Sequence, residues 1–243
     1  MARALVFQHL AVEHPGSLGL MLAAAGVELV TVELDQGDAV PDLDPFDLLV
    51  VMGGPMDVWE DARHPWMSGE KVAIRRWVTE LGRPYLGVCL GHQLLADALG
   101  GEVRPMAAPE VGVVRLDPTA EASVDPLFSS IPRAVDGLQW HGAEVTRLPP
   151  NSTLLASNDA CAVQAFRVGR RAWGVQFHVE VQATTVDLWR EVPAYRQALE
   201  HTGIDAGSLA LAVADGLDAM TEVAGHLAEG LLAVMDLEPA SRP

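Results

Sequence analysis

Residues 84–93 read Pro-Tyr-Leu-Gly-Val-Cys-Leu-Gly-His-Gln, an apolar strand that turns sharply into a helix expected over 93–99. Cys89 stands at this turn between two glycines, Gly87 and Gly91. A residue at such a turn takes a strained backbone angle, and small neighbours avoid the clashes that the turn creates. The pattern is typical of a nucleophile elbow with a thiol in place of a hydroxyl, and the positive end of the following helix favours a thiolate. Cys89 is therefore a candidate nucleophile, and a buried structural cysteine is the alternative.

The chain around this turn predicts an open, mostly parallel α/β sheet with helices on both faces, as in flavodoxin-like folds. Apolar runs expected to form strands lie at 4–7, 28–34, 47–52 and 85–88, and expected helices lie at 18–25 and 70–81. Continuous apolar strands that alternate with helices are typical of parallel sheets buried on both faces. Shorter strand-like pieces follow at 113–116, 144–148, 153–156, 163–168 and 172–177, and they predict antiparallel additions.

The last stretch predicts a long helix with one apolar face. Eight apolar residues recur there at spacings of three and four: Leu209, Val213, Leu217, Met220, Val223, Leu227, Leu231 and Val234. We therefore expect a main domain over 1–190 and a C-terminal helical extension over 191–243. The apolar face would pack on that domain or on an oligomer partner.

The composition restricts the partners and the compartment. With 33 acidic and 16 basic residues, the net charge of -17 disfavours binding to nucleic acid or to anionic membranes. The N-terminus lacks the pattern of a secretory signal, so we expect a cytoplasmic protein with reduced thiols. The second cysteine, Cys161, is expected to be structural.

Two further motifs carry groups that a thiol nucleophile needs. Along an extended chain, residues i and i+2 point to the same side, so Glu180 can reach the imidazole of His178 and orient it as a base. Gly53-Gly54-Pro55 ends an expected strand, and the Gly54 N–H could form an oxyanion hole with the N–H of Leu90. A solvated ion pair and a plain loop are the respective alternatives.

The segment His9-x-x-x-Glu13-His14 contains metal-ligand residue types, but it lacks a paired spacing such as His-Glu-x-x-His. We therefore expect no metal there and no cofactor. The chain also lacks a Gly-x-x-x-x-Gly-Lys phosphate-binding loop.

Several separated motifs between Phe46 and Glu180 together resemble the class I (triad-type) glutamine amidotransferases, in particular stand-alone domains similar to the glutaminase part of GMP synthetase. They are Met52-Gly53-Gly54-Pro55-Met56, His64-Pro65-Trp66, Gly87 to Gln93, Glu110-Val111-Gly112, Trp140-His141-Gly142, Gln164-Ala165-Phe166 and Gly174 to Glu180. The resemblance implies a triad of Cys89, His178 and Glu180. It also implies that Gln93 and the backbone of Gly142 bind the substrate, and His141 is a further candidate for lining its pocket.

The chain departs from the family pattern at two positions. Val179 replaces the usual proline of Phe-His-Pro-Glu, which could loosen the turn between base and acid. Ala143 replaces the common aspartate after His-Gly, which puts part of the substrate pocket in question.

The resemblance implies that glutamine is hydrolysed through a cysteinyl thioester with release of ammonia, without a metal. Such an enzyme usually serves an ATP-dependent synthetase, so we expect such a partner and leave a homo-oligomer open. Two alternatives remain at this point. One is a hydrolase of γ-glutamyl peptides or conjugates with the same triad, and the other is a non-catalytic regulatory module with the same fold.

Overall fold

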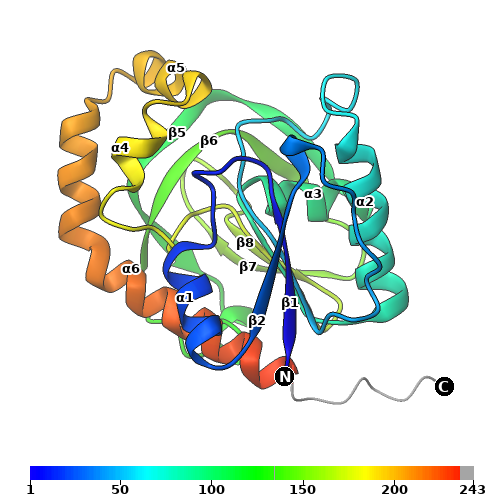
Figure 1. Cartoon of the computed structure of the whole chain (residues 1–243). Coiled ribbons are helices and arrows are strands. Elements are labelled where there is room, and N and C mark those ends of the chain that lie inside the picture. Colours follow the sequence, from blue (N-terminus) through cyan, green and yellow to red (C-terminus); the bar gives the residue numbers. More distant parts are fainter. Residues whose placement is uncertain (134, 236–243) are drawn as a thin grey trace.

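The computed structural model describes residues 1–133 and 135–235, which form a nine-stranded sheet flanked by helices (Figure 1). The strands are β1 (Arg3–Gln8), β2 (Glu28–Glu33), β3 (Leu48–Val51), β4 (Tyr85–Val88), β5 (Glu102–Pro118), β6 (Val135–Arg147), β7 (Ser152–Ser157), β8 (Ala165–Val168) and β9 (Ala172–Val175). The α-helices are α1 (Gly16–Ala24), α2 (Trp66–Arg76), α3 (Leu90–Ala98), α4 (Thr185–Trp189), α5 (Pro193–Thr202) and α6 (Ala206–Met235). A π-helical turn, η2 (Trp77–Leu81), continues α2, and 3-10 turns lie at η1 (Leu34–Gln36) and η3 (Glu121–Val124).

The sheet has a parallel half and an antiparallel half. Its strand order is β2-β1-β3-β4-β9-β8-β7-β5-β6. The five strands from β2 to β9 are parallel, and the remaining neighbours pair antiparallel. The order of the parallel half is that of flavodoxin-like folds, where ligands bind beyond the carboxyl ends of the strands. The expected fold class is confirmed.

Alternate residues of the central strands pack into two separate cores, one on each face of the sheet. On β1, Ala4 and Val6 pack with α1, α5 and α6, whereas Leu5 and Phe7 pack with α2 and α3. All four side chains are fully buried. Because side chains alternate along a strand, a continuous apolar run is the pattern that fills both cores.

The expected antiparallel pieces at 113–116 and 144–148 are parts of much longer strands. β5 and β6 have 17 and 13 residues and pair along most of their length, with a register shift between Pro105 and Glu110. The sequence-based bounds for these two strands were wrong because prolines and glycines interrupt the apolar pattern. In the structure, a bulged register accommodates them.

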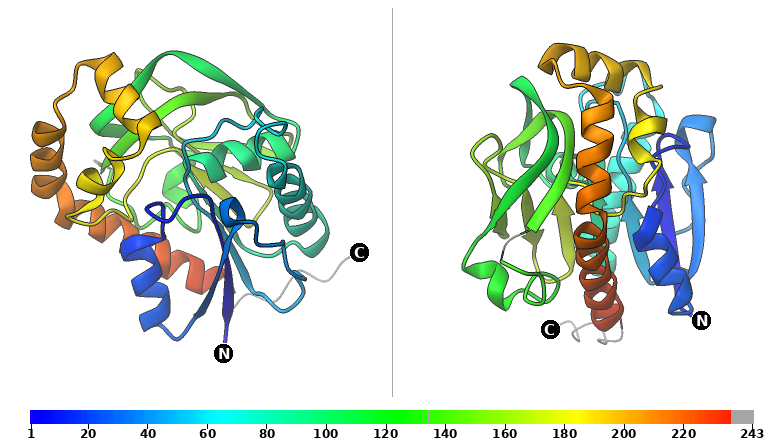
Figure 2. Two further views of the ribbon diagram at one scale, coloured as in Figure 1. Left: turned by 45° about the horizontal axis from the view of Figure 1, so that its top comes forward. Right: turned by 90° about the vertical axis from the view of Figure 1, so that its left-hand side faces the viewer.

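The apolar face of α6 packs against the protein's own chain. The helix contacts α1 on one side and β5 and β6 on the other, and in Figure 2 it runs between the blue and the green segments. Leu209, Val213, Leu227 and Leu231 are buried in this contact. The division of the chain at residue 190 stays a prediction.

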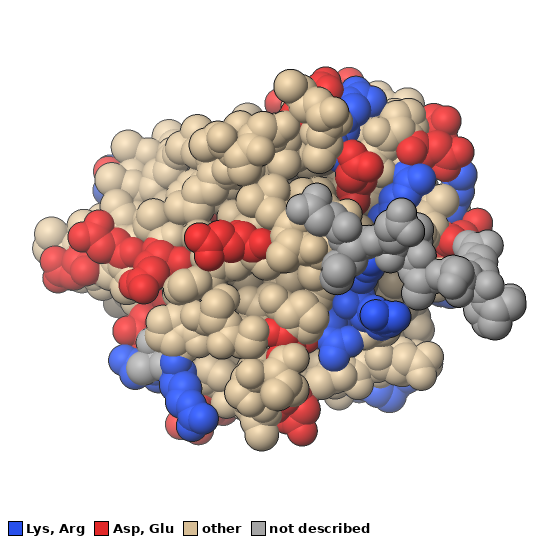
Figure 3. Space-filling model, turned by 90° about the horizontal axis from the view of Figure 1, so that it is seen from below, with Lys and Arg blue, Asp and Glu red and all other residues tan. Residues whose placement is uncertain are grey.

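On the face of the molecule seen from below (Figure 3), charged side chains lie in several separate groups. The face shown in Figure 3 carries separate acidic and basic groups between uncharged residues. Among the described residues, no helix combines the length and the apolar character that crossing a membrane requires.

Candidate active site

The turn between β4 and α3 has the geometry expected of a nucleophile elbow. Cys89 has φ 50° and ψ −102°, one of two positive φ angles at non-glycine positions among the described residues. A methyl group on Gly91 would lie 2.1 Å from the Val51 carbonyl oxygen, so a larger residue there would collide with β3. The N–H of Cys89 donates to the Val175 carbonyl at 2.8 Å, which ties the elbow to β9. The expected strain at Cys89 is confirmed.

His178 and Glu180 follow β9 and meet as the extended-chain argument predicts. His178 Nδ1 lies 2.6 Å from Glu180 Oε1, and both side chains are buried. Burial lowers the pKa of His178, but the Glu180 carboxylate and a hydrogen bond with the Cys89 thiol raise it, and the net result lies well above the usual value. The buried pair therefore favours a protonated imidazole beside the sulfur.

Val179 adds a hydrogen bond where loosening was expected. Its N–H donates to Glu180 Oε2 at 3.0 Å, so each oxygen of the carboxylate has a donor. A proline has no N–H and could not make this bond. Replacement of the usual proline thus fixes Glu180 through the backbone of its neighbour.

Residues outside the expected triad surround His178. Trp189, the last residue of α4, lies edge-to-face on the imidazole with 4.7 Å between ring centroids, and its indole N–H donates to the Val12 carbonyl at 3.0 Å. Tyr195 of α5 donates its hydroxyl to buried Glu13. Burial raises the pKa of Glu13, while His178 and the Tyr195 hydrogen bond lower it, with a net increase.

The backbone at Gly53 and Gly54 lies close to neighbouring side chains. A methyl group on Gly53 would lie 2.5 Å from a Glu13 carboxylate oxygen, and one on Gly54 would lie 3.0 Å from both His9 Cβ and Leu90 Cδ2. A side chain at Gly53 would therefore displace the Glu13 carboxylate, and Gly54 has little room. Leu90 is the first residue of α3, so its N–H has no partner within the helix.

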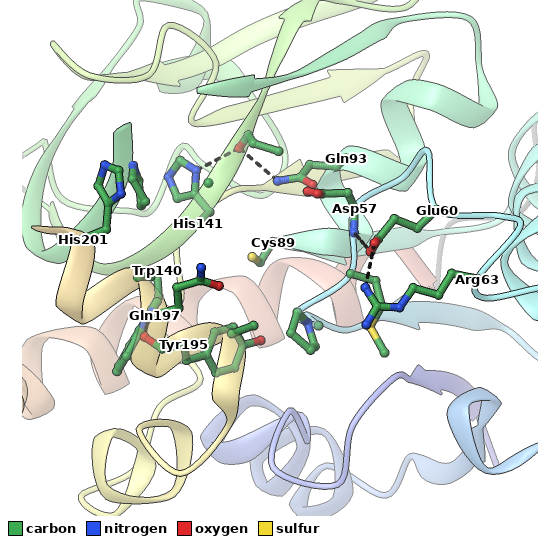
Figure 4. Close-up of a pocket in the computed structure, with 18 residues that line it drawn as sticks. Asp57, Glu60, Arg63, Cys89, Gln93, Trp140, His141, Tyr195, Gln197 and His201 are labelled. Atoms are coloured by element: carbon green, nitrogen blue, oxygen red, sulfur yellow. Dashed lines mark hydrogen bonds and ion pairs between the residues drawn. The ribbon is translucent and has the colours of Figure 1, made fainter. Parts of the chain in front are cut away.

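A cavity of about 370 Å³ opens in front of Cys89 (Figure 4). In Figure 4, Cys89 lies between side chains from the loop after β3 and side chains from α5. The lining residues include the expected Gly54, Cys89, Gln93, His141 and Gly142, together with Asp57, Glu60, Arg63, Trp140, Tyr195, Gln197 and His201. His178 and Glu180 do not line the cavity and lie behind it, buried.

Both N–H groups of the Gln93 amide, which lines the cavity, are engaged. Its Nε2 donates to the Ala143 carbonyl at 3.1 Å and to Gln176 Oε1 at 3.0 Å. His141 Nδ1 donates to the same carbonyl at 2.9 Å, and its Nε2 lies 3.0 Å from Glu110. Ala143 thus contributes to the site through its backbone oxygen, although its side chain carries no acid.

Sequence reasoning missed the contribution of α4 and α5 and of the loop with Asp57, Glu60 and Arg63. The pattern of α5 is that of an ordinary amphipathic helix, and nothing local marks Tyr195 as a pocket residue. Its pairing with Glu13 spans 182 positions in the chain, which periodicity does not reveal.

His9 and His14, the histidines of the segment first considered for metal binding, have separate environments. His9 is fully buried between Gly53 and Glu70, whereas His14 Nδ1 accepts the Gly16 N–H at 3.1 Å. Within the described residues, no three His, Cys, Asp or Glu side chains gather in a metal-binding cluster.

Comparison with known proteins gives consistent matches across sequence and structure. The model of the family "Glutamine amidotransferase class-I" matches residues 17–188. A subunit of the glutamine-hydrolyzing GMP synthase from Sulfolobus acidocaldarius is 34% identical over 160 residues, which cover 65% of this chain and 79% of that protein. The match to the GMP synthase of Thermotoga petrophila, 35% identical, covers 59% of this chain and 26% of that protein.

Two crystal structures of glutamine amidotransferases are similar over almost the whole chain. The protein from Thermotoga maritima has a TM-score of 0.85 with 27% identity, covering 95% of this chain and 98% of that one. The protein from Methylobacillus flagellatus has a TM-score of 0.81 with 26% identity, covering 100% and 99%. The resemblance stated from the sequence motifs is confirmed.

Proposed function

Because the chain belongs to the class-I glutamine amidotransferase family, it is an enzyme that hydrolyses glutamine, and we propose that Cys89, His178 and Glu180 carry out this reaction. The observation that supports these roles is the strained backbone of Cys89 beside the His178–Glu180 pair, whose Nδ1 and Oε1 atoms are 2.6 Å apart. A nucleophile, a base and a group that orients the base are the parts that covalent acyl transfer requires.

In the proposed reaction, the thiolate of Cys89 attacks the side-chain amide carbon of glutamine. The N–H groups of Gly54 and Leu90 stabilise the oxyanion that develops. His178 donates its proton to the leaving nitrogen, ammonia departs and a thioester remains. His178 then takes a proton from water, which attacks the thioester and releases glutamate while the thiol is regenerated. Glu180 keeps the imidazole in the required tautomer and stabilises its charge.

Gln93, His141 and Gly142 are proposed to bind the amino-acid end of the substrate. The free oxygen of the Gln93 amide suits an ammonium group, since both N–H groups of that amide are engaged elsewhere. Gly142 lines the cavity with open space around its Cα, so its backbone is accessible to a ligand.

We also propose that a separate ATP-dependent synthetase receives the ammonia. The support is that the chain covers 79% of a relative that is named as one subunit of a GMP synthase. We expect this chain to co-elute stably with an ATP-using synthetase in size-exclusion chromatography. We also expect the mixture to form the product of the synthetase in a glutamine-dependent manner. Free thiols at Cys89 and Cys161 are compatible with the cytoplasmic location that we propose.

Release of ammonia from glutamine by the wild-type protein and by Cys89→Ala tests the central assignment. We expect turnover by the wild type and a loss of at least about a thousandfold in the variant, because removal of a nucleophile leaves only binding and oxyanion stabilisation. γ-Glutamyl peptides assayed in parallel measure substrate preference. Equal turnover by both proteins would contradict the role of Cys89.

A further inference from the structure

The buried pair of His9 and Glu70 lies directly behind one of the two proposed oxyanion donors. His9 follows β1 and Glu70 lies on α2, and both side chains are fully buried. His9 Nε2 is 2.8 Å from Glu70 Oε1, and His9 Nδ1 is 2.9 Å from the carbonyl oxygen of Gly53. Because a carbonyl oxygen only accepts hydrogen bonds, Nδ1 carries a proton and donates it to Gly53.

The carbonyl of Gly53 and the N–H of Gly54 belong to the same peptide group. No cis peptide bond occurs among the described residues, so this C=O and this N–H point in opposite directions. His9 holds the carbonyl on the buried side, and Gly54 lines the cavity that contains Cys89. A peptide between two glycines rotates more freely than most, so an anchor on its carbonyl fixes where its N–H points.

Three neighbours fix the imidazole of His9 itself. Glu70 and Gly53 bind its two nitrogens, and Trp66 stacks on its face with 5.3 Å between ring centroids and 15° between ring planes. Trp66 and Glu70 are four residues apart on α2 and therefore share one side of that helix. Burial lowers the pKa of His9, whereas Glu70 and the bond to Gly53 raise it, and the net shift is upward.

We propose that His9, held by Glu70 and Trp66, is a positioning residue that aims the Gly54 N–H at the developing oxyanion. The inference rests on the proposed function. Burial lowers the pKa of His9, but Glu70 raises it and so favours the protonated imidazole. A protonated donor on the Gly53 carbonyl polarises the peptide and strengthens its N–H as a hydrogen-bond donor. His9 contributes without touching the substrate.

The test compares His9→Leu, which removes the donor, with His9→Asn, whose amide nitrogen can lie near the position of Nδ1. We expect His9→Leu to lower kcat for glutamine about 10- to 100-fold with little change in KM, since removal of a whole oxyanion donor costs about 100- to 1000-fold. His9→Asn should recover a large part of this loss. His226→Leu on α6, remote from the cavity, is the matched control and should keep the wild-type kcat.

Alkylation of Cys89 by iodoacetamide separates positioning of the oxyanion donor from a general disturbance of the site. This displacement forms no oxyanion, so its rate should stay within about twofold of wild type in His9→Leu. A wild-type kcat in His9→Leu would overturn the inference. An equal loss of alkylation and hydrolysis, with no recovery in His9→Asn, would also overturn it.

Glu70→Gln keeps the test decisive where His9→Leu fails to fold. With a neutral partner, the pKa of His9 falls while its bond to Gly53 remains, so kcat should fall at least about threefold while alkylation is unchanged. A wild-type kcat in a folded Glu70→Gln protein would overturn the inference. Absence of Cys89-dependent hydrolysis in the wild type would overturn the proposed function and the inference together, whereas an active wild type with unaffected variants overturns the inference alone.

Discussion

The carboxylate of Glu180 shows how one residue is fixed by several weak constraints. Its two oxygens receive His178 Nδ1 and the N–H of Val179, and its backbone carbonyl accepts the Ser17 N–H at 2.8 Å. A methyl group on Gly16 would lie 1.8 Å from that carbonyl oxygen, so glycine is required where α1 begins. Glu180, the proposed orienting acid, is thus held by its own neighbour and by the start of a helix far away in sequence.

Replacement of Glu180 by glutamine should change the pH dependence of the reaction. The pKa of His178 is lowered by burial and raised above its usual value by Glu180 and Cys89. Without the carboxylate this pKa falls, and the protonated imidazole that serves the leaving nitrogen is lost at lower pH. We therefore expect the alkaline limb of kcat/KM against pH to move to lower pH, with a reduced maximum. Glu191→Gln, a substitution at an exposed carboxylate, should leave the limb in place, and an unchanged limb in Glu180→Gln would contradict the role of Glu180.

The proximity of Cys89, His178 and Glu180 could be predicted from the sequence because each residue stands in a short local pattern. Glycines flank Cys89, and His178 and Glu180 are two positions apart on an extended segment. Glu13, Trp189 and Tyr195 carry no such mark, since their contacts join segments distant in the chain. The catalytic roles of the proposed triad stay predictions, as do those of Gly54, Leu90 and the substrate-binding residues, because the geometry places them together without a substrate.

Among the elements, the two short helices after β9 supply residues to the site in addition to those at the ends of the parallel strands. Trp189, at the end of α4, packs on His178, and Tyr195, in the first turn of α5, lines the cavity. Trp140 of β6 donates its indole N–H to the Tyr195 carbonyl at 3.2 Å, which connects α5 to the antiparallel half of the sheet. The site is therefore a junction of both halves of the fold.

The contact between α5 and the loop after β1 should appear as a coupling energy between Tyr195 and Glu13. Tyr195→Phe removes a donor from a buried carboxylate and should cost about 1–3 kcal/mol of unfolding free energy. In a Glu13→Met background the same change should cost well under about 1 kcal/mol, because no carboxylate needs the donor. Urea unfolding of the wild type, the two single variants and the double variant measures this coupling energy. Equal costs of Tyr195→Phe in both backgrounds would show that the hydroxyl does not act through Glu13.

The lengths and the pairing of the elements show where the fold predicted from the sequence was incomplete. Four of the five parallel strands could be predicted, because each is an apolar or largely apolar run that alternates with helices. The segment at 172–177 was expected among the antiparallel additions, and this was wrong for its pairing with β4, because β9 lies parallel to β4 and antiparallel only to β8. β5 and β6 contain Pro105, Pro109 and Gly137 and read locally as separate pieces. Their length follows from pairing with each other, with a register shift after Pro105, and this pairing is a property of two segments together.

For the whole molecule, one of the two cores is closed by segments from opposite ends of the described chain. α1 packs against α6, so residues near the start and the end of the described chain cover one face of the sheet together. The opposite core holds α2 and α3, and the elbow at Cys89 begins α3 there. Folding of either core therefore stabilises the strand ends on which the triad stands.

Acid stability of the whole protein should depend on His92, whose side chain is fully buried on α3 beside Phe166. Burial lowers the pKa of His92 from 6.5 to about 3. The unfolded chain therefore binds a proton that the folded protein does not, and the stability contributed by neutral His92 is lost as the pH falls from about 6.5 to about 3. This one group contributes a slope of at most about 1.4 kcal/mol per pH unit. Urea unfolding between those pH values should show a shallower loss for His92→Gln than for the wild type, while His201→Gln, at an exposed site, should follow the wild type. Parallel curves for His92→Gln and the wild type would mean that His92 gains its proton without unfolding.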